Sequence, residues 1–263
     1  MSQLGNANKM PINSVIEEAD KLVAKGQFHN AYQFLKVSLR TYDDVELLWR
    51  YAQACFLCVY YVNNKPCKEY CERYFTEGMD ASKKAIEKNP NHANSLTWYC
   101  ILWDEHNNLK GFTERFKNIS ELYDMLMRSQ KIDPNNFLTE SSLGIWHYIV
   151  TEAYNTKPEL FKDTKFTGKE FSYELGLKHM LKCEELAPMR SVVTLEYLAK
   201  CYARLGQKEK SKDYCLKVLN YPADHAESKE IPMVRHNTTG IISLYKFTRR
   251  KEFYKNLHLL CFL

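Results

Sequence analysis

The clearest pattern of apolar and polar positions lies in residues 195–222. Two stripes with the 3.6-residue period of an α-helix follow each other there. The first consists of Leu195, Leu198, Ala199 and Tyr202, and the second of Ser211, Cys215, Val218 and Leu219. Gly206 lies between them and can take the left-handed conformation that often ends a helix, while Pro222 cannot donate the next helical hydrogen bond. The pattern predicts two short helices joined by a tight turn.

The length and punctuation of this unit are typical of the tetratricopeptide repeat (TPR), a helix-turn-helix of about 34 residues. Prolines that would close further helix pairs recur along the chain, at Pro90, Pro134, Pro188 and Pro222. Only the last interval has the standard repeat length. We therefore predict that the earlier units carry insertions, which a stacked repeat can place in a loop or a longer helix.

The predicted fold class is all-α: a TPR-like right-handed superhelix of antiparallel helix pairs with irregular insertions. We expect a flexible N-terminus over residues 1–12 and one helical domain over residues 13–263. Its predicted parts are residues 13–43, 44–90, 91–134, 135–188 and 191–222, followed by capping helices within 227–258. An insertion is expected around residues 62–74, and an irregular loop over 155–166. A capping box at residues 167–170 is expected to start the helix that follows.

Composition narrows the class of protein further. No apolar run reaches the roughly 18 residues that a membrane-spanning helix needs. The N-terminal residues lack the apolar core of a signal peptide. The nine cysteines are an odd number, which without a secretory signal favours reduced thiols and a cytoplasmic location.

Positive charge is concentrated near the C-terminus. Residues 196–255 contain 13 Lys/Arg and 7 Asp/Glu, whereas the whole chain has a net charge of +5. Such a basic region is expected to attract an acidic partner. The candidate binding residues are Lys200, Arg204, Lys246, Arg249, Arg250 and Lys251. The alternative is that each of these side chains only keeps a helix surface solvated.

Aromatic residues recur at first-helix positions of the predicted units. Packing between neighbouring helices would account for most of them. An open aromatic groove, which would accept a peptide or a lipid chain, is the alternative. The candidate groove residues are Trp49, Trp103, Trp146 and Tyr202.

Catalytic and metal-binding motifs are scarce. Cys55 and Cys58, with Cys67 and Cys71, have a spacing that zinc sites use, but the first pair lies in a strongly apolar segment, where cysteine behaves as a small hydrophobic residue. Buried structural cysteines are the favoured interpretation. The sequence contains no HExxH, GxSxG, P-loop or GxGxxG motif. We expect no enzymatic activity, no cofactor and no metal.

The order of landmarks after residue 99 points to a particular family. The landmarks are Ile132-Asp133-Pro134-Asn135, Leu143-Gly144-Ile145-Trp146, Leu160-Phe161, Glu184-Glu185-Leu186-Ala187-Pro188, Lys200-Cys201-Tyr202 and Leu205-Gly206. Their order resembles the regulator of microtubule dynamics family, whose members share a TPR-like helical domain. The resemblance covers residues 14–222. It implies association with microtubules, with tubulin as the partner, and a role in microtubule growth or at spindles.

We therefore expect a non-enzymatic interaction protein whose basic residues contact acidic tubulin surfaces. Two alternatives belong to other classes. One is a TPR adaptor that binds a peptide of a protein partner in its concave groove, and the other is a carrier of a small apolar ligand such as a lipid. Nucleic acid is not an expected partner, because stacking aromatic residues are not interleaved with the basic ones.

Overall fold

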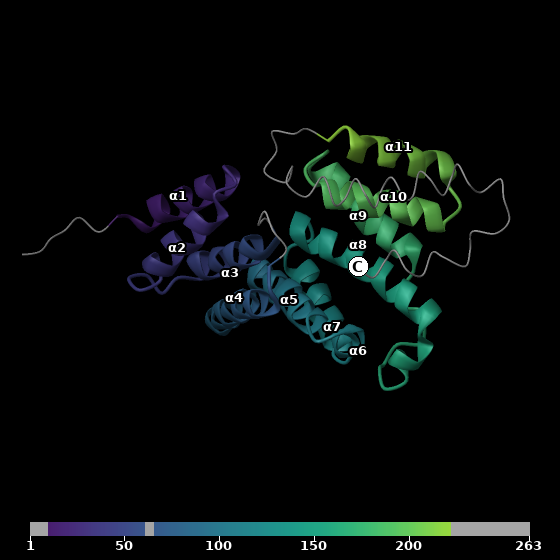
Figure 1. The fold of residues 1–263 in the computed structure, drawn as a ribbon, viewed down its shortest axis with the longest axis horizontal. Coiled ribbons are helices and arrows are strands. Elements are labelled where there is room, and N and C mark those ends of the chain that lie inside the picture. Colours follow the sequence, from purple (N-terminus) through teal and green to yellow (C-terminus); the bar gives the residue numbers. More distant parts are fainter. Residues whose placement is uncertain (1–9, 61–65, 222–263) are drawn as a thin grey trace, which may run out of the picture. The chain divides into compact units, whose positions relative to one another are not determined.

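The computed structural model describes residues 10–60 and 66–221, and most of these residues are helical. Eleven α-helices and one 3₁₀ helix lie in these ranges, and the same ranges contain no β-strand (Figure 1). The all-α class predicted from the sequence is confirmed. The chain divides into two compact units, an N-terminal unit of Met1–Leu109 and a C-terminal unit of Lys110–Leu263.

In the N-terminal unit, each helix from α1 to α5 packs against the next one along the chain. The central helix, α3, packs against α2, α4 and α5. The first turn contains Gly26 at φ +68°, a left-handed conformation that glycine adopts at no steric cost. The helices are α1 (Ile12–Ala24), α2 (Phe28–Ser38), α3 (Val45–Tyr60), α4 (Lys68–Lys88) and α5 (Ala93–Asn108).

Helix α4 changes the interpretation of the insertion expected around residues 62–74. It begins at Lys68 and runs for 21 residues, so the second half of that segment is helical rather than loop. Cys71, Tyr74 and Phe75 are buried on α4. Burial of these side chains explains why the added residues extend a helix that the unit already contains.

Gly78 lies where α4 closely approaches its neighbours α3 and α5. A Cβ atom at this position would lie 2.8 Å from Leu102 Cδ1 and 3.1 Å from Cys55 Cβ. Both neighbours are fully buried, and protein interiors are packed too densely to yield freely. The small residue therefore sets the distance between α4 and the helices α3 and α5.

The variant Gly78→Ala is expected to lower the free energy of unfolding by about 1 kcal/mol, because overpacking outweighs the better helix propensity of alanine. Urea denaturation followed by circular dichroism would measure the change. Thr76→Ala, at an exposed position of the same helix, is the control and should be neutral or slightly stabilising. Equal stability of the two variants would show that the contact at Gly78 is not tight.

In the C-terminal unit, α8 to α11 pack successively against one another in chain order (Figure 1). Helix α8 also contacts α7, η1 and α10. The elements are α6 (Phe112–Phe116), α7 (Ile119–Ile132), α8 (Phe137–Thr156), η1 (Pro158–Phe161), α9 (Tyr173–Leu186), α10 (Val192–Arg204) and α11 (Lys208–Leu219).

The capping box expected at residues 167–170 does not cap α9, although this helix begins after those residues, at Tyr173. Glu170 does accept hydrogen bonds from the backbone N–H and hydroxyl of Thr167, both at 2.9 Å, but these close a turn within the loop. Gly168 has φ +90°, which a right-handed helix cannot accommodate. The N-cap is instead Ser172, whose hydroxyl accepts from the backbone N–H of Leu175. The loop expected over residues 155–166 also contains η1.

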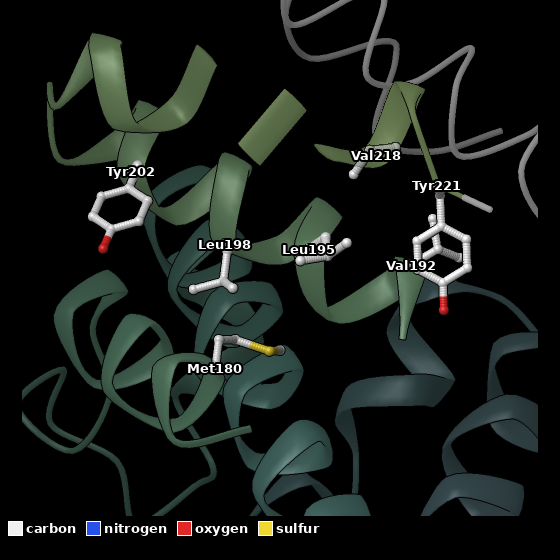
Figure 2. Packing of buried hydrophobic residues seen from close by; sticks show 7 residues of the cluster. All are labelled: Met180, Val192, Leu195, Leu198, Tyr202, Val218 and Tyr221. Atoms are coloured by element: carbon white, nitrogen blue, oxygen red, sulfur yellow. The ribbon is translucent and has the colours of Figure 1, made fainter. Parts of the chain in front are cut away.

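The last helix pair follows its sequence pattern closely. Helix α10 ends at Arg204, Gly206 takes φ +72°, and α11 begins at Lys208. The buried side chains of the two helices meet one another and α9 in one apolar cluster, which is shown in Figure 2: Met180, Val192, Leu195, Leu198, Tyr202, Val218 and Tyr221. Pro222 and the capping helices predicted within 227–258 lie outside the described residues.

Candidate functional site

Two of the six predicted basic residues, Lys200 and Arg204, lie one turn apart on α10. Lys200 Nζ is 2.7 Å from Glu196 Oε1, on the turn before it. The same ammonium group lies 4.5 Å from the ring centroid of Tyr197. Glu196 is buried, so Lys200 compensates a carboxylate that has little access to water.

Arg204 is held more tightly, by a carboxylate of another helix. Its Nε lies 2.5 Å from Oε1 of Glu152 on α8, and its Nη2 donates to Oε2 at 2.7 Å. The hydroxyl of Tyr173, at the start of α9, also donates to Glu152 Oε1, at 2.6 Å. This two-pronged pairing is the strong geometry for arginine and carboxylate. It joins α8, α9 and α10.

The surroundings of Arg204 and Tyr173 keep the guanidinium charged and the phenol neutral. Burial opposes the charged form of Arg204, but Tyr148 and Glu152 beside it raise the pKa of the guanidinium. Burial and the hydrogen bond to Glu152 raise the pKa of Tyr173. At neutral pH Arg204 is therefore a cation and Tyr173 a neutral phenol.

The four other predicted basic residues, Lys246, Arg249, Arg250 and Lys251, lie outside the described residues. The two that the structure places have carboxylate partners within the C-terminal unit. Whether any of the six contacts a partner stays a prediction. Their positive charge at α10 is balanced internally.

Exposed positive charge is found instead on α11, which the sequence-based site did not include. Lys208 and Lys212 are exposed on successive turns, and neither makes an ion pair within residues 10–60 and 66–221. Lys210 lies over the ring of Tyr202 at 5.4 Å. In the sequence, four lysines within residues 208–217 could have indicated this exposed positive charge. Glu209 and Asp213 lie between them and make the pattern less clear.

The predicted groove residues divide between the two units. In the C-terminal unit Trp146 and Tyr202 are each 5% exposed. Trp146 stacks on Tyr123 with ring centroids 4.3 Å apart, and Tyr202 packs on α11. In the N-terminal unit Trp49 and Trp103 are half-buried. Packing thus accounts for the first two, and a partner-binding role for any of the four stays a prediction.

A buried carboxylate of the C-terminal unit, Glu140 of α8, accepts hydrogen bonds from three side chains of neighbouring helices. Its side chain is 1% exposed. Nδ1 of His179 donates to one oxygen at 2.7 Å, while Lys182 Nζ and Gln130 Nε2 donate to the other at 2.9 and 3.0 Å. Burial opposes ionisation, but the hydrogen bonds from His179, Gln130 and Lys182 lower the pKa of Glu140 to about 2. The cluster links α7, α8 and α9.

His147 lies next to this cluster and is 2% exposed. Its ring stacks on that of His179, with centroids 5.3 Å apart and planes 10° apart. Its Nδ1 is buried and has no hydrogen-bond partner among the described residues. Burial and the neighbouring His179 lower the pKa of His147 to about 3. The imidazole is therefore neutral at physiological pH.

Glu77 of α4 joins helices of the N-terminal unit in the way that Glu140 joins helices of the C-terminal unit. Its Oε2 accepts hydrogen bonds from Tyr51 at 2.5 Å, Tyr32 at 2.8 Å and Lys36 at 2.9 Å. Burial opposes its charge, yet these donors lower the pKa of Glu77. Helices α2, α3 and α4 are tied together at this point.

The cysteine pattern considered for zinc is partly buried. Cys55, Cys58 and Cys71 lie in the core of the N-terminal unit, whereas Cys67 is exposed. Burial raises the pKa of Cys58 to about 12, which disfavours the thiolate that metals bind. Among the residues with a described position, no three or more His, Cys, Asp or Glu gather as metal ligands.

No helix within residues 10–60 and 66–221 is long and apolar enough to cross a membrane.

Comparison with known proteins shows that the chain matches one protein family over most of its length. Residues 15–239 match the family described as "Regulator of microtubule dynamics protein 1-3". The chain is 24% identical over 220 residues to regulator of microtubule dynamics protein 1 of Pongo abelii, covering 84% of this chain and 69% of the relative. It is 26% identical over 225 residues to the protein of the same name in Bos taurus, covering 86% and 70%.

Among solved structures, the chain is similar to the crystal structure of a thermophilic TPR protein of Thermus thermophilus. The TM-score is 0.61 at 11% sequence identity, with 87% of this chain and 99% of the other covered. At this identity the likeness concerns the fold. It confirms the TPR-like architecture predicted from the repeat pattern.

Proposed function

Because the chain belongs to the regulator of microtubule dynamics family, we propose that it is a non-enzymatic protein that associates with microtubules and influences their growth or organisation. Family membership is the observation that carries this proposal. The TPR-like fold supports it, since stacked helix pairs provide extended surfaces for protein partners. We propose a cytoplasmic, cytoskeleton-associated location, including the spindle.

Electrostatic attraction is the proposed basis of the contact. The acidic C-terminal tails of tubulin would meet the basic region, to which Lys208 and Lys212 of α11 contribute exposed charge. The predicted residues Lys246, Arg249, Arg250 and Lys251 belong to the same region of the chain. An attraction of this kind acts over about 10 Å at 0.1 M salt and weakens as salt is added.

Co-pelleting with polymerised tubulin tests the proposal. The full chain should pellet with microtubules at low salt and be released as the salt concentration rises. Removal of the tubulin tails by limited proteolysis should have the same effect. Pelleting that is indifferent to both treatments would contradict the electrostatic mechanism, and no pelleting at any salt concentration would contradict microtubule association.

The double variant Lys208→Glu with Lys212→Glu is expected to weaken microtubule affinity by about threefold to tenfold at low salt, because two exposed cations become anions. The matched control is Lys162→Glu with Lys169→Glu. It changes the net charge equally at exposed positions of the loop that contains η1. Equal losses in both variants would mean that net charge, and not α11, determines binding.

A further inference from the structure

We propose that the surface around Arg204 and Lys200 is a binding site for an acidic peptide segment and that the protein's own carboxylates, Glu152 and Glu196, close it. The inference rests on the proposed function, because it concerns how an acidic partner is admitted. The partner is defined by its chemistry: a flexible segment with several neighbouring carboxylates.

The first argument is the geometry at Arg204. Glu152 occupies the guanidinium with two contacts, at 2.5 and 2.7 Å. A carboxylate from a partner can make the same two contacts, because fork-to-fork pairing is general for arginine and carboxylate. The Arg204 side chain is 30% exposed, so an incoming group can reach it from solvent. Replacement of Glu152 would preserve the charge balance of α10.

The second argument is the spacing of the two cations. Lys200 and Arg204 are four residues apart on α10, which corresponds to about 6 Å along a helix. In an extended peptide, alternate side chains lie on one side and are about 6.6 Å apart. Two carboxylates at alternate positions of an acidic segment therefore match the two cations.

The third argument explains why the site is closed in the isolated chain. Glu152 also accepts a hydrogen bond from Tyr173 at 2.6 Å, and Glu196 is buried beside Lys200. A partner must displace contacts that are already made. The apparent affinity is then reduced by the small fraction of molecules in which the cations are free. Loss of an internal carboxylate should therefore strengthen binding.

The test uses the full chain and a fluorescein-labelled peptide of ten glutamates, with affinity measured by fluorescence anisotropy at low salt. Glu152→Gln is expected to bind the peptide about fivefold more tightly than wild type. The matched control is Glu159→Gln, which makes the same charge change at an exposed position of η1. It should alter the affinity by less than about twofold.

A double-mutant cycle identifies the released group. Arg204→Gln alone should weaken peptide binding, because it removes one of the two cations of the site, and Glu152→Gln should give no gain in affinity when it is added to Arg204→Gln. A gain that persists in the double variant, or equal gains for Glu152→Gln and Glu159→Gln, would overturn the inference. Should Glu152→Gln be poorly folded by circular dichroism, Tyr173→Phe removes only the supporting hydroxyl. It should strengthen binding by about twofold, and an unchanged affinity would count against the inference.

The result is separable from that of the microtubule assay. Wild-type protein that pellets with microtubules, together with a Glu152→Gln variant that gains no peptide affinity, would contradict the inference alone. Wild-type protein that never pellets would contradict the proposed function. In that case the peptide measurement still decides whether Glu152 closes an acidic-peptide site.

Discussion

Replacing Glu140 with alanine is expected to lower the free energy of unfolding by about 3 kcal/mol, because the variant leaves His179 and Lys182 without their buried carboxylate. Three donors from α7 and α9 converge on this side chain of α8. For a chain of this size the loss corresponds to a fall of roughly 6–12 °C in the melting temperature. Differential scanning calorimetry would measure it.

The control for this prediction is Glu185→Ala. Glu185 is exposed on α9, and its removal should cost less than about 0.5 kcal/mol. The difference between wild type and Glu140→Ala should also depend on pH. The pKa of Glu140 is lowered from 4.5 to about 2 in the folded protein, so its stabilising contribution is complete above pH 4.5 and disappears as the pH falls to about 2. A difference that is constant over this range would contradict the assignment.

The second large effect concerns acid sensitivity at His147. Its folded pKa of about 3 is below the ordinary value of 6.5, so below pH 6.5 the unfolded chain binds a proton that the folded protein excludes. Stability therefore falls with decreasing pH between about 6.5 and 3. Between pH 7.5 and pH 5 this histidine should cost wild type about 2 kcal/mol. The variant His147→Leu should be spared that loss.

Urea denaturation at pH 7.5 and at pH 5 would give the loss in the free energy of unfolding for each protein. The effect of His147 is the loss in wild type minus the loss in His147→Leu. His29→Leu removes an exposed histidine of α2 and should retain the pH dependence of wild type. Parallel losses in wild type and His147→Leu would show that the ring accepts a proton in the folded protein. That outcome would also contradict its close packing against His179.

The prediction from the sequence was most successful where the signal is short-range. The apolar stripes and Gly206 located α10 and α11, because helical periodicity and a left-handed glycine act within a few residues. Residues 167–170 show the limit of such reasoning. The sequence has the composition of a capping box, and Thr167 and Glu170 do pair, but the positive φ of Gly168 places the helix start at Tyr173.

The contacts that the candidate site residues make could not be predicted from the sequence, for one reason. Its deciding contacts join residues far apart in the chain: Arg204 and Glu152 are separated by 52 positions, and Glu140 and His179 by 39. No local pattern indicates which carboxylate meets which cation. Lys200 and Arg204 therefore appeared to be available basic residues, although each has a carboxylate partner within the C-terminal unit.

For this protein, the all-α class, the TPR-like repeat and the family resemblance could be read from the amino-acid sequence, since they depend on the order and period of apolar residues. The pairing of charges required the packing of α8, α9 and α10, because the crossing of helices selects polar partners across long sequence separations. The same packing gives Lys200 and Arg204 carboxylate partners within the C-terminal unit, while Lys208 and Lys212 present exposed positive charge on α11.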